Sequence, residues 1–230
     1  MEAILKEGFN ISVASKDDRT DIWRVFLEAY GKDEIWDCVV RNVVNPKDIL
    51  PWLCIHFASR WEMPDVTVYK ITDIVSGAIV GWGGLQTPWK YLKSEMTVQL
   101  KAEATSTKLP PVLEGMNTEA LDELLKTLYA AKSHGYDPEF DYHRRGSMII
   151  PKFQKLGFGT YLAQFCNQIS DTKGDKQWVP ARPTSVNMFK KNGYVEMGTV
   201  DAHLERWDGL REKSNTYLLL RCPPNPPNLS

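Results

Sequence analysis

The strongest constraint on the fold is the direct succession of a strand, a tight loop and a helix between residues 142 and 170. The stretch 142–150 is typical of a strand and ends at Pro151, which has no N–H group to continue a ladder. Gly157 and Gly159 mark the loop, because glycine adopts backbone conformations that are strained for other residues. Apolar residues at helical spacing follow over 160–170. Any fold of this chain must therefore turn a strand into a helix within a few residues.

The loop, 154–159, offers a site for an anion. The first N–H groups of a helix have no acceptor within the helix, and together with the helix dipole they attract negative charge. Lys155 adds a positive charge, and the glycines let a ligand approach the backbone closely. The string is neither a dinucleotide fingerprint nor a P-loop, because it lacks the third glycine and the G-K-[ST] ending. A pyrophosphate is the expected occupant, and a plain strand-to-helix turn is the alternative.

The remaining elements predict an α+β fold. A helix is expected after the N-cap Ser15, and further helices over 35–44, 49–61, 117–133 and 185–192. Strands are expected over 10–14, 66–72, 79–85, 178–181, 194–200 and 216–220. The strands 66–72 and 79–85 should form an antiparallel hairpin, in which the cluster Gly81, Gly83 and Gly84 indicates a bulge or a close approach. Residues 86–116 show no clear period and predict a long irregular excursion over the surface.

Composition excludes several classes of function. The 28 basic and 29 acidic residues give a formal net charge of −1, so no basic field attracts nucleic acid. The N-terminal stretch has no long apolar run, which predicts a cytoplasmic protein without a signal peptide or membrane helix. The four cysteines have neither metal-ligand nor C-x-x-C spacing, so we expect free thiols, no disulfide and no metal.

Residues 147–194 resemble the GNAT acetyltransferase superfamily. The family pattern is a strand L-x-V-x-P, then [QR]-x-x-G-x-[GA], a helix, a strand and a second short helix that ends in G-[FY]. The matching stretches are Ser147-Met148-Ile149-Ile150-Pro151-Lys152-Phe153-Gln154-Lys155-Leu156-Gly157-Phe158-Gly159, Trp178-Val179-Pro180-Ala181 and Asn187-Met188-Phe189-Lys190-Lys191-Asn192-Gly193-Tyr194. A fainter likeness to fungal GNAT-domain proteins lies upstream, in Arg60-Trp61, Val68-Tyr69-Lys70, Asp73 and Ile79-Val80-Gly81-Trp82.

The resemblance implies a GNAT fold. This fold has a central mixed, mostly antiparallel sheet of six to seven strands, with a splayed strand pair and flanking helices. It implies one domain over 1–222, followed by a Pro-rich tail at 223–230. Within that domain, 8–135 would carry the acceptor-side helices and the hairpin, and 136–200 would form the acyl-CoA-binding core. The excursion 86–116 could then form part of an acceptor pocket.

The resemblance also implies acetyl-CoA as co-substrate, with no metal. The pantetheine arm would pair with the backbone of Met148, Ile149 and Ile150 in the gap beside the splayed strand. The pyrophosphate would sit on the loop and the first turn of the helix, at Gln154, Lys155, Leu156, Gly157, Phe158, Gly159 and Thr160. Asn187, Phe189 and Lys190 lie where the second helix approaches the cofactor, although Asn187 could equally be a helix N-terminal residue without a ligand.

Acyl transfer to an amine needs a general base and an N–H donor for the oxygen of the tetrahedral intermediate. His143 lies 11 residues before Gln154, a spacing that matches a base position in the family, and an imidazole titrates near neutrality. Asp141 and Glu139 are nearby alternatives, and a purely structural histidine at the strand end is another. Alternation along the strand predicts one shared face for His143, Arg145, Ser147 and Ile149. The backbone N–H near Ile149 or Ile150 is the expected oxyanion donor.

Phe189 departs from the family pattern. Many members carry a tyrosine at this position, which is assigned as the acid for the leaving thiolate, and phenylalanine has no proton to donate. Water, Tyr161 or Tyr194 could replace that tyrosine, or the thiolate could leave unassisted. The departure also leaves open a protein that binds CoA or a metabolite without acyl transfer, or one recruited to other small-molecule chemistry in a biosynthetic pathway.

Two features bear on the acceptor. Arg144 and Arg145 are neighbours on the strand and are therefore predicted to face opposite ways, one toward solvent and the other toward the acceptor, where a guanidinium would suit a carboxylate. The alternative, which is slightly favoured, is a surface ion pair. The tryptophans of the N-terminal half would either line a pocket for an aromatic or apolar molecule or pack as core; they are Trp36, Trp52, Trp61, Trp82 and Trp89. We expect a small-molecule amine acceptor, no nucleic acid or membrane partner, and a monomer or homodimer.

Overall fold

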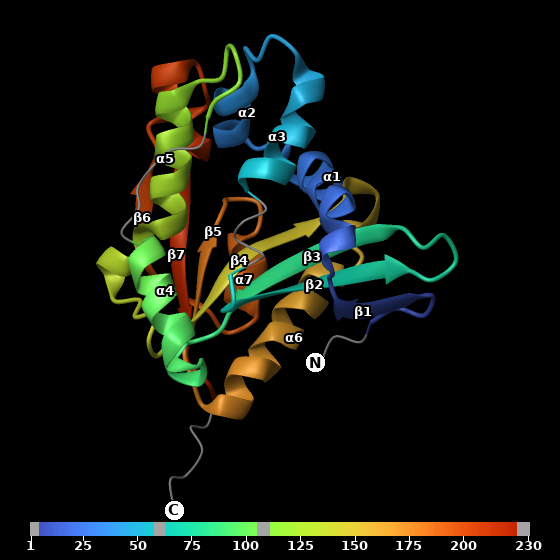
Figure 1. Ribbon diagram of the computed structural model, residues 1–230, viewed down its shortest axis with the longest axis vertical. Helices are drawn as coiled ribbons and strands as arrows, with labels where there is room; N and C mark the ends of the chain where they lie inside the picture. Colours follow the sequence, from blue (N-terminus) through green and yellow to red (C-terminus); the bar gives the residue numbers. More distant parts are fainter. Residues whose placement is uncertain (1–4, 58–62, 105–110, 225–230) are drawn as a thin grey trace, which may run out of the picture.

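The structure is a computed structural model that describes residues 5–57, 63–104 and 111–224. A sheet of seven strands lies at its centre, in the order β1-β2-β3-β4-β5-β7-β6 (Figure 1). The strands are β1 (Phe9–Val13), β2 (Val66–Asp73), β3 (Ile79–Gln86), β4 (Tyr142–Ile149), β5 (Gln177–Ala181), β6 (Val195–Asp201) and β7 (Asn215–Arg221). All neighbours pair antiparallel except β4 and β5, which run parallel. The predicted α+β fold with a mixed, mostly antiparallel sheet is confirmed.

Helices cover both faces of the sheet, as Figure 1 shows. On one face, which we call the N-terminal face, lie α1 (Arg19–Tyr30), α2 (Glu34–Val40), α3 (Ile49–His56) and α5 (Thr118–Tyr129). On the other, the α6 face, lie α6 (Phe158–Lys173) and α7 (Val186–Lys191). Shorter 3₁₀ helices fill the connections: η1 (Lys16–Asp18), η2 (Pro46–Asp48), η4 (Trp89–Tyr91), η5 (Ala130–His134), η6 (Pro151–Phe153), η7 (Leu204–Trp207) and η8 (Arg211–Lys213).

The core explains why these helices hold their places. On the N-terminal face, Ile22 and Val25 of α1 pack against Trp82 and Met148, because they recur at helical spacing on one stripe. A second cluster joins α1, α2, α3 and α5 and buries Trp36 and Trp52. Trp82 and Trp89 are buried as well. These tryptophans therefore pack as core, and Trp61 lies outside the described residues.

Several predicted boundaries need correction. Residues 86–116 are not a plain irregular excursion, because β3 runs to Gln86 and α4 (Ser94–Ala104) follows η4. The sequence SEMTVQLKAEA has a weak apolar stripe, but it is rich in strong helix formers, which is the signal that periodicity missed. The helix predicted over 35–44 ends at Val40, and the end of the one predicted over 49–61 falls partly on undescribed residues. The helix after the glycine loop begins earlier than predicted, at Phe158, and ends at the left-handed Gly174.

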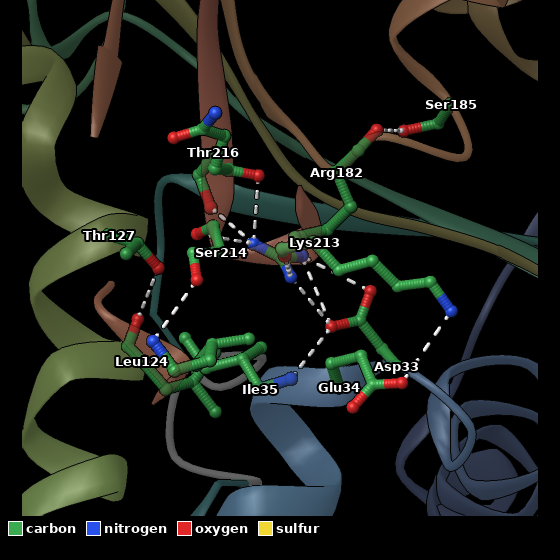
Figure 2. Close-up of polar contacts among 12 residues, drawn as sticks. Asp33, Glu34, Ile35, Leu124, Thr127, Arg182, Ser185, Lys213, Ser214 and Thr216 are labelled. Carbon is green, nitrogen blue, oxygen red and sulfur yellow. Dashed lines mark hydrogen bonds and ion pairs between the residues drawn. The ribbon is translucent and has the colours of Figure 1, made fainter. Parts of the chain in front are cut away.

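Arg182 lies directly after β5 and links the β5–β7 part of the sheet to the turn before α2. The sheet itself joins its β1–β4 part to its β5–β7 part only through a short β4–β5 pairing. Its Nε donates to both carboxylate oxygens of Asp33 at 3.1 Å, and Asp33 also caps α2 by accepting the N–H of Ile35 (Figure 2). The remaining guanidinium N–H groups reach the start of β7, including the Asn215 carbonyl and the Thr216 hydroxyl, both at 3.0 Å. The side chains of Arg182 and Asp33 are 10% and 11% exposed, so this ion pair is nearly buried.

Two further findings concern the chain as a whole. Across the part that the structure describes, no helix combines the length and apolar character needed to cross a membrane. The four cysteines are free thiols: Cys38 and Cys166 are buried, Cys54 is half-buried and Cys222 is exposed.

Candidate functional site

Strands β4 and β5 separate almost as soon as they meet. They pair only at Tyr142 with Gln177 and at His143 with Trp178. Beyond His143 the strands diverge, so that β4 turns away from β5 in Figure 1. The edge of β4 from Arg144 to Ile149 therefore has no strand partner on the β5 side among the described residues. This gap is the splayed strand pair that the family resemblance implied.

A bulge at the start of the gap reverses the alternation of side chains. Gly83 pairs with Ser147 and Leu85 with Arg144, so the single residue Gly84 lies opposite both Arg145 and Gly146. Gly146 has φ +117, a conformation that favours glycine, and a Cβ there would lie 2.7 Å from the Trp82 ring. The predicted shared face for His143, Arg145, Ser147 and Ile149 is therefore wrong. His143 and Arg145 lie on the N-terminal face, but Ser147 contacts Arg144 and Ile149 packs with Leu162 on the α6 face.

The open edge of β4 presents backbone groups of Ile149. Ile150 donates its N–H to the Val80 carbonyl of β3 at 3.0 Å, so it is not available as an oxyanion donor. Since successive N–H groups of a strand point to opposite neighbours, the N–H of Ile149 points into the gap. The Ile149 carbonyl accepts a hydrogen bond from the Gln154 side chain at 2.8 Å. Of the two predicted donors, only Ile149 fits the geometry.

The loop 154–159 is exposed and held open. Lys155 and Gly157 adopt left-handed conformations, with φ 59 and φ 95, and Tyr161 donates its N–H to the Gly157 carbonyl at 2.9 Å. A Cβ placed on Gly157 or Gly159 would meet nothing within 4 Å, so the space over the start of α6 is free. Phe158 is buried against Phe9, which fixes the loop from below, so only its backbone can face a ligand. Leu156 and Thr160 complete the stretch, which presents N–H groups to solvent, as an anion site requires.

The α6 face beneath the gap contains a buried cation. Arg144 is 1% exposed and donates to the Leu162 carbonyl at 3.2 Å and to the Ser147 hydroxyl. Its Nε has no hydrogen-bond partner, and no carboxylate pairs with it in the described part of the chain. Tyr194 and Cys166 lie nearby, and burial raises the pKa of each.

On the N-terminal face, four polar side chains form a cluster, the Gln86 cluster. The Gln86 Oε1 accepts from the Tyr136 hydroxyl at 3.2 Å, from Arg145 Nε at 2.8 Å and from Arg145 Nη2. Its Nε2 donates to Asp65 Oδ2 at 2.5 Å, which also accepts the Trp89 indole N–H at 2.9 Å. Asp65 is 1% exposed, and its Oδ1 has no partner among the described residues. The two arginines face opposite ways, as predicted, but neither forms a surface ion pair.

His143 lies beside this cluster. It is 1% exposed, and its ring packs on Tyr136 with the centroids 4.8 Å apart. Burial, and then the charge of Arg145, lower the pKa of His143 well below its usual value of 6.5, so the ring is neutral at pH 7. Asp141 has a different surrounding: it accepts the Asp137 N–H and the Trp178 indole N–H, both at 3.1 Å. Burial raises the pKa of Asp141, and its contacts are those of a residue that holds Trp178 in place.

The three predicted residues of α7 point in different directions. Asn187 is exposed in the first turn. Phe189 is 2% exposed and packs edge-on against Tyr194 in the cluster between α6, β5 and β7. Lys190 pairs with Glu196 of β6 at 2.8 Å and lies over the Tyr217 ring, so its charge is directed toward β6 and β7. The structure therefore brings together the loop and the edge of β4, but it does not direct Lys190 toward them.

Sequence reasoning missed three members of the Gln86 cluster. Asp65, Gln86 and Tyr136 come from three distant segments and carry no motif. The one available signal was a polar residue, Gln86, at the end of an otherwise apolar strand. Burial of Asp65 and Tyr136 depends on the pairing of β3 with β4 and on the path of η5, which no local pattern reveals.

Two other features lie away from the gap. A cavity of about 160 Å³ opens between β1, β2 and the start of α1, three strands from β5, and is lined by Ala14, Lys16 and Val68 among others. Asp201, His203 and Glu205 place their ligand atoms within 4.8 Å of one another, but His203 and Glu205 are exposed and nothing further points to an ion. Neither feature contributes to the site described above.

Comparison with known proteins supports the fold. No protein-family model matches the chain, and no curated protein is similar to it in sequence. Among solved structures, the chain resembles arylalkylamine N-acetyltransferase 2 from Aedes aegypti (12% identity, 94% of this chain and 99% of that chain, TM-score 0.62). It also resembles a mosquito arylalkylamine N-acetyltransferase-like protein (17%, 93% and 99%, 0.58) and the ribosomal-protein-S18-alanine N-acetyltransferase from Escherichia coli (11%, 96% and 99%, 0.56).

These similarities define the class of fold. The seven-stranded mixed sheet flanked by helices matches these GNAT acetyltransferases, and the chain has the GNAT fold. At 11–17% identity, the similarity carries the fold and leaves the reaction to the residues of the site.

Proposed function

We propose that this chain is an acyl-CoA-dependent N-acyltransferase that transfers an acetyl group from acetyl-CoA to the amine of a small molecule. One observation carries the proposal: an unpaired strand edge, Arg144–Ile149, leads directly to a loop whose N–H groups and glycines face open space. The edge suits the amides of a pantetheine arm, and the loop suits a pyrophosphate. A plain strand-to-helix turn would not need both features side by side.

The donor would use backbone groups more than side chains. The pantetheine arm would run along Met148–Ile150, and the pyrophosphate would rest on the start of α6, over Gly157 and Gly159. Gln154 holds the Ile149 carbonyl, so its amide would have to exchange that contact for one with the ligand. Lys155 is exposed and available to the phosphates. Asn187 is exposed and free to contact the donor, whereas Lys190 and Phe189 would contribute less than the resemblance implies.

The chemistry would proceed by direct attack of the amine on the thioester carbonyl. The N–H of Ile149 would stabilise the oxygen of the tetrahedral intermediate. His143, neutral at pH 7, would accept the proton that the amine loses. Because Phe189 has no hydroxyl, the thiolate would leave unassisted, which its pKa of about 8.5, by analogy with cysteine, permits.

Phe189 also favours a second candidate function, one without acyl transfer. Phe189 is buried in the core and supplies no acid, and His143 is enclosed. Both facts are compatible with a protein that binds CoA or a metabolite without transferring an acyl group, or that carries out other chemistry on a small molecule. CoA release that depends on an added amine distinguishes the transferase from the binding protein, and the mass of the product distinguishes acetyl transfer from other chemistry.

Calorimetric titration with acetyl-CoA and with free CoA tests the proposal. We expect micromolar binding by the wild type and loss of binding, by at least ~100-fold, in Gly157→Val, because the side chain would occupy the space above the loop. Gly77→Val is the matched control: Gly77 also has a positive φ and open space, but lies in the β2–β3 turn. No wild-type binding up to millimolar, or equal binding by Gly157→Val, would contradict the proposed donor site.

Other parts of the proposal remain predictions: a single domain over 1–222 with a tail at 223–230, most of which lies outside the described residues, a cytoplasmic location, and a monomer or homodimer. The likeness to fungal proteins and a role in secondary metabolism are of the same kind. The absence of nucleic acid, membrane and metal partners also stays an expectation.

A further inference from the structure

Two buried or half-buried arginines elsewhere in the described molecule have carboxylate partners: Arg182 pairs with Asp33 and Arg221 with Asp171. The two arginines of β4 differ from them, since neither forms an ion pair with any residue that the structure describes. Arg144 is sealed under α6, whereas Arg145 is half-buried on the N-terminal face. Arg145 is therefore a cation that a ligand could reach.

The guanidinium of Arg145 is held in a fixed orientation. Its Nε and Nη2 both donate to the Gln86 Oε1, and the ring of Tyr129 lies 5.4 Å from its central carbon. Gln86 cannot turn away, because its amide nitrogen is bound to the buried Asp65. A guanidinium fixed in this way loses little conformational entropy when it binds, which is the property of a preorganised recognition group.

Part of the guanidinium remains unused. A guanidinium has five N–H donors, and the contacts with Gln86 occupy one on Nε and one on Nη2. In the residues that are described, Nη1 has no hydrogen-bond acceptor. Two adjacent N–H groups in a fixed plane match the two oxygens of a carboxylate.

The unused N–H groups of Arg145 lie close to the residues of the proposed reaction. Arg145 forms the bulge at which β4 leaves β5, two residues after His143 and on the same face as His143. The Tyr136 hydroxyl joins Arg145 at Gln86, and the His143 ring packs on Tyr136. A molecule bound at Arg145 would therefore lie beside His143 and the thioester end of the β4 edge.

We propose that Arg145 binds a carboxylate of the acceptor, so that the substrate is an amine that also carries a carboxylate, as an amino acid does. This inference rests on the proposed acyl transfer and names its substrate class. The cation faces the side of the sheet covered by α1 and α5, opposite α6, and this is the side left for an acceptor when the donor occupies the start of α6. Amines without a carboxylate, polyamines above all, would be repelled by the same charge.

The test uses matched pairs of acceptors. The full chain is assayed with acetyl-CoA and the 20 standard amino acids, each beside its α-amide, which keeps the amine and removes the negative charge; CoA release is measured with a thiol reagent. We expect at least one amino acid to be a substrate with kcat/KM roughly 10–100-fold above that of its amide, the usual effect of one charge-assisted contact.

Variants assign this preference to Arg145. Arg145→Gln should lower kcat/KM for the amino acid by roughly 10–100-fold and change that for the amide less than about 3-fold, so that the preference disappears. Arg145→Lys keeps the charge without the fork and should restore part of the preference. Arg206→Gln is the control, since Arg206 also lies on an aromatic ring, that of Trp207 at 4.4 Å, but is 47% exposed on η7. Thermal unfolding of each variant checks that the fold is intact.

Several results would overturn the assignment. Equal kcat/KM for acids and amides, transfer to amides alone, no transfer to either series by a protein that binds acetyl-CoA, or a preference that survives Arg145→Gln would each do so. A preference for succinyl-CoA over acetyl-CoA that Arg145→Gln removes would instead place the carboxylate on the acyl group, and would also overturn it. Failure of the wild type to bind acetyl-CoA is a different result, because it removes the proposed function and this inference with it.

Discussion

The two faces of β4 differ in what they do with the same side chain. On the α6 face, Arg144 is 1% exposed and bonds to Ser147 and the Leu162 carbonyl, which lie within the packed layer between sheet and helix. On the N-terminal face, Arg145 is half-buried and bonds to the polar Gln86 cluster, with an unused edge. One arginine completes a core, and its neighbour is the residue that we propose binds the acceptor.

The difference shows that burial on its own does not indicate function. Arg144 is the more unusual residue, since a buried cation without an anion is costly, yet it is enclosed and faces no ligand path. Arg145 is energetically ordinary, because water reaches it, and the proposed contact with an acceptor carboxylate requires that access. Ordinary strand alternation separates the two roles, since neighbouring residues of β4 face opposite sides of the sheet, and the bulge at Gly146 ends that alternation directly after Arg145.

The largest expected effect is on stability, from truncating Arg144. Arg144→Ala should lower the free energy of unfolding by about 2–5 kcal/mol, because it leaves a cavity under α6. Arg145→Ala should lower it by less than about 1 kcal/mol. Urea unfolding of both variants measures the contrast. Arg144→Met keeps the volume without the charge and should cost less than Arg144→Ala; equal losses for Arg144→Ala and Arg145→Ala would remove the distinction between the faces.

An intermediate effect is expected at the bulge. Gly146→Ala should cost about 1–3 kcal/mol, because φ is +117 and the new Cβ would lie 2.7 Å from the Trp82 ring. Gly77→Ala, with φ +71 and open space, carries only the backbone cost and serves as the control. Comparison of the two by urea unfolding isolates the contact with Trp82. A smaller loss for Gly146→Ala than for Gly77→Ala would show that the bulge is not fixed by this contact.

The smallest effect is the pH dependence that His143 contributes. Its pKa is lowered in the folded protein, so between that value and about 6.5 the unfolded chain binds more protons than the folded one. The contribution of His143 to the free energy of unfolding should therefore be complete above about pH 6.5. Below that pH it should fall, by at most about 1.4 kcal/mol per pH unit. Unfolding measured between pH 5 and 7.5 should lose this slope in His143→Phe and keep it in His203→Asn, an exposed control. An unchanged slope in His143→Phe would mean that the ring is charged in the folded state.

The order of elements and the donor loop could be predicted from the sequence, because both depend on local signals. Pro151, Gly157 and the helical spacing after Thr160 determine a strand, a loop and a helix without reference to the rest of the chain. The separation of β4 from β5 came from the family resemblance and agrees with the structure.

The acceptor side could not be predicted, because it is made by tertiary pairing. Asp65, Gln86 and Tyr136 converge only after β3 pairs with β4 and the segment after η5 brings Tyr136 to Gln86. The shared face expected for His143 and Ser147 failed for a related reason: a strand's period of two holds only while each residue has one partner, and Gly84 faces two. Charge on Lys190 was expected at the cofactor, but Glu196, on the strand that directly follows the helix of Lys190, binds that lysine instead.

The ion pair between Arg182 and Asp33 has a mechanical consequence. The two parts of the sheet share only two residue pairs between β4 and β5, so by themselves they would act as a hinge. Arg182 joins the end of β5 and the start of β7 to the turn before α2, and α1, on the other side of that turn, packs on β3 and β4. This strut spans the hinge and sets the width of the gap before any ligand arrives. The gap between β4 and β5 is thus made stiff when the protein folds. A donor that enters the gap need not hold the two parts of the sheet in position.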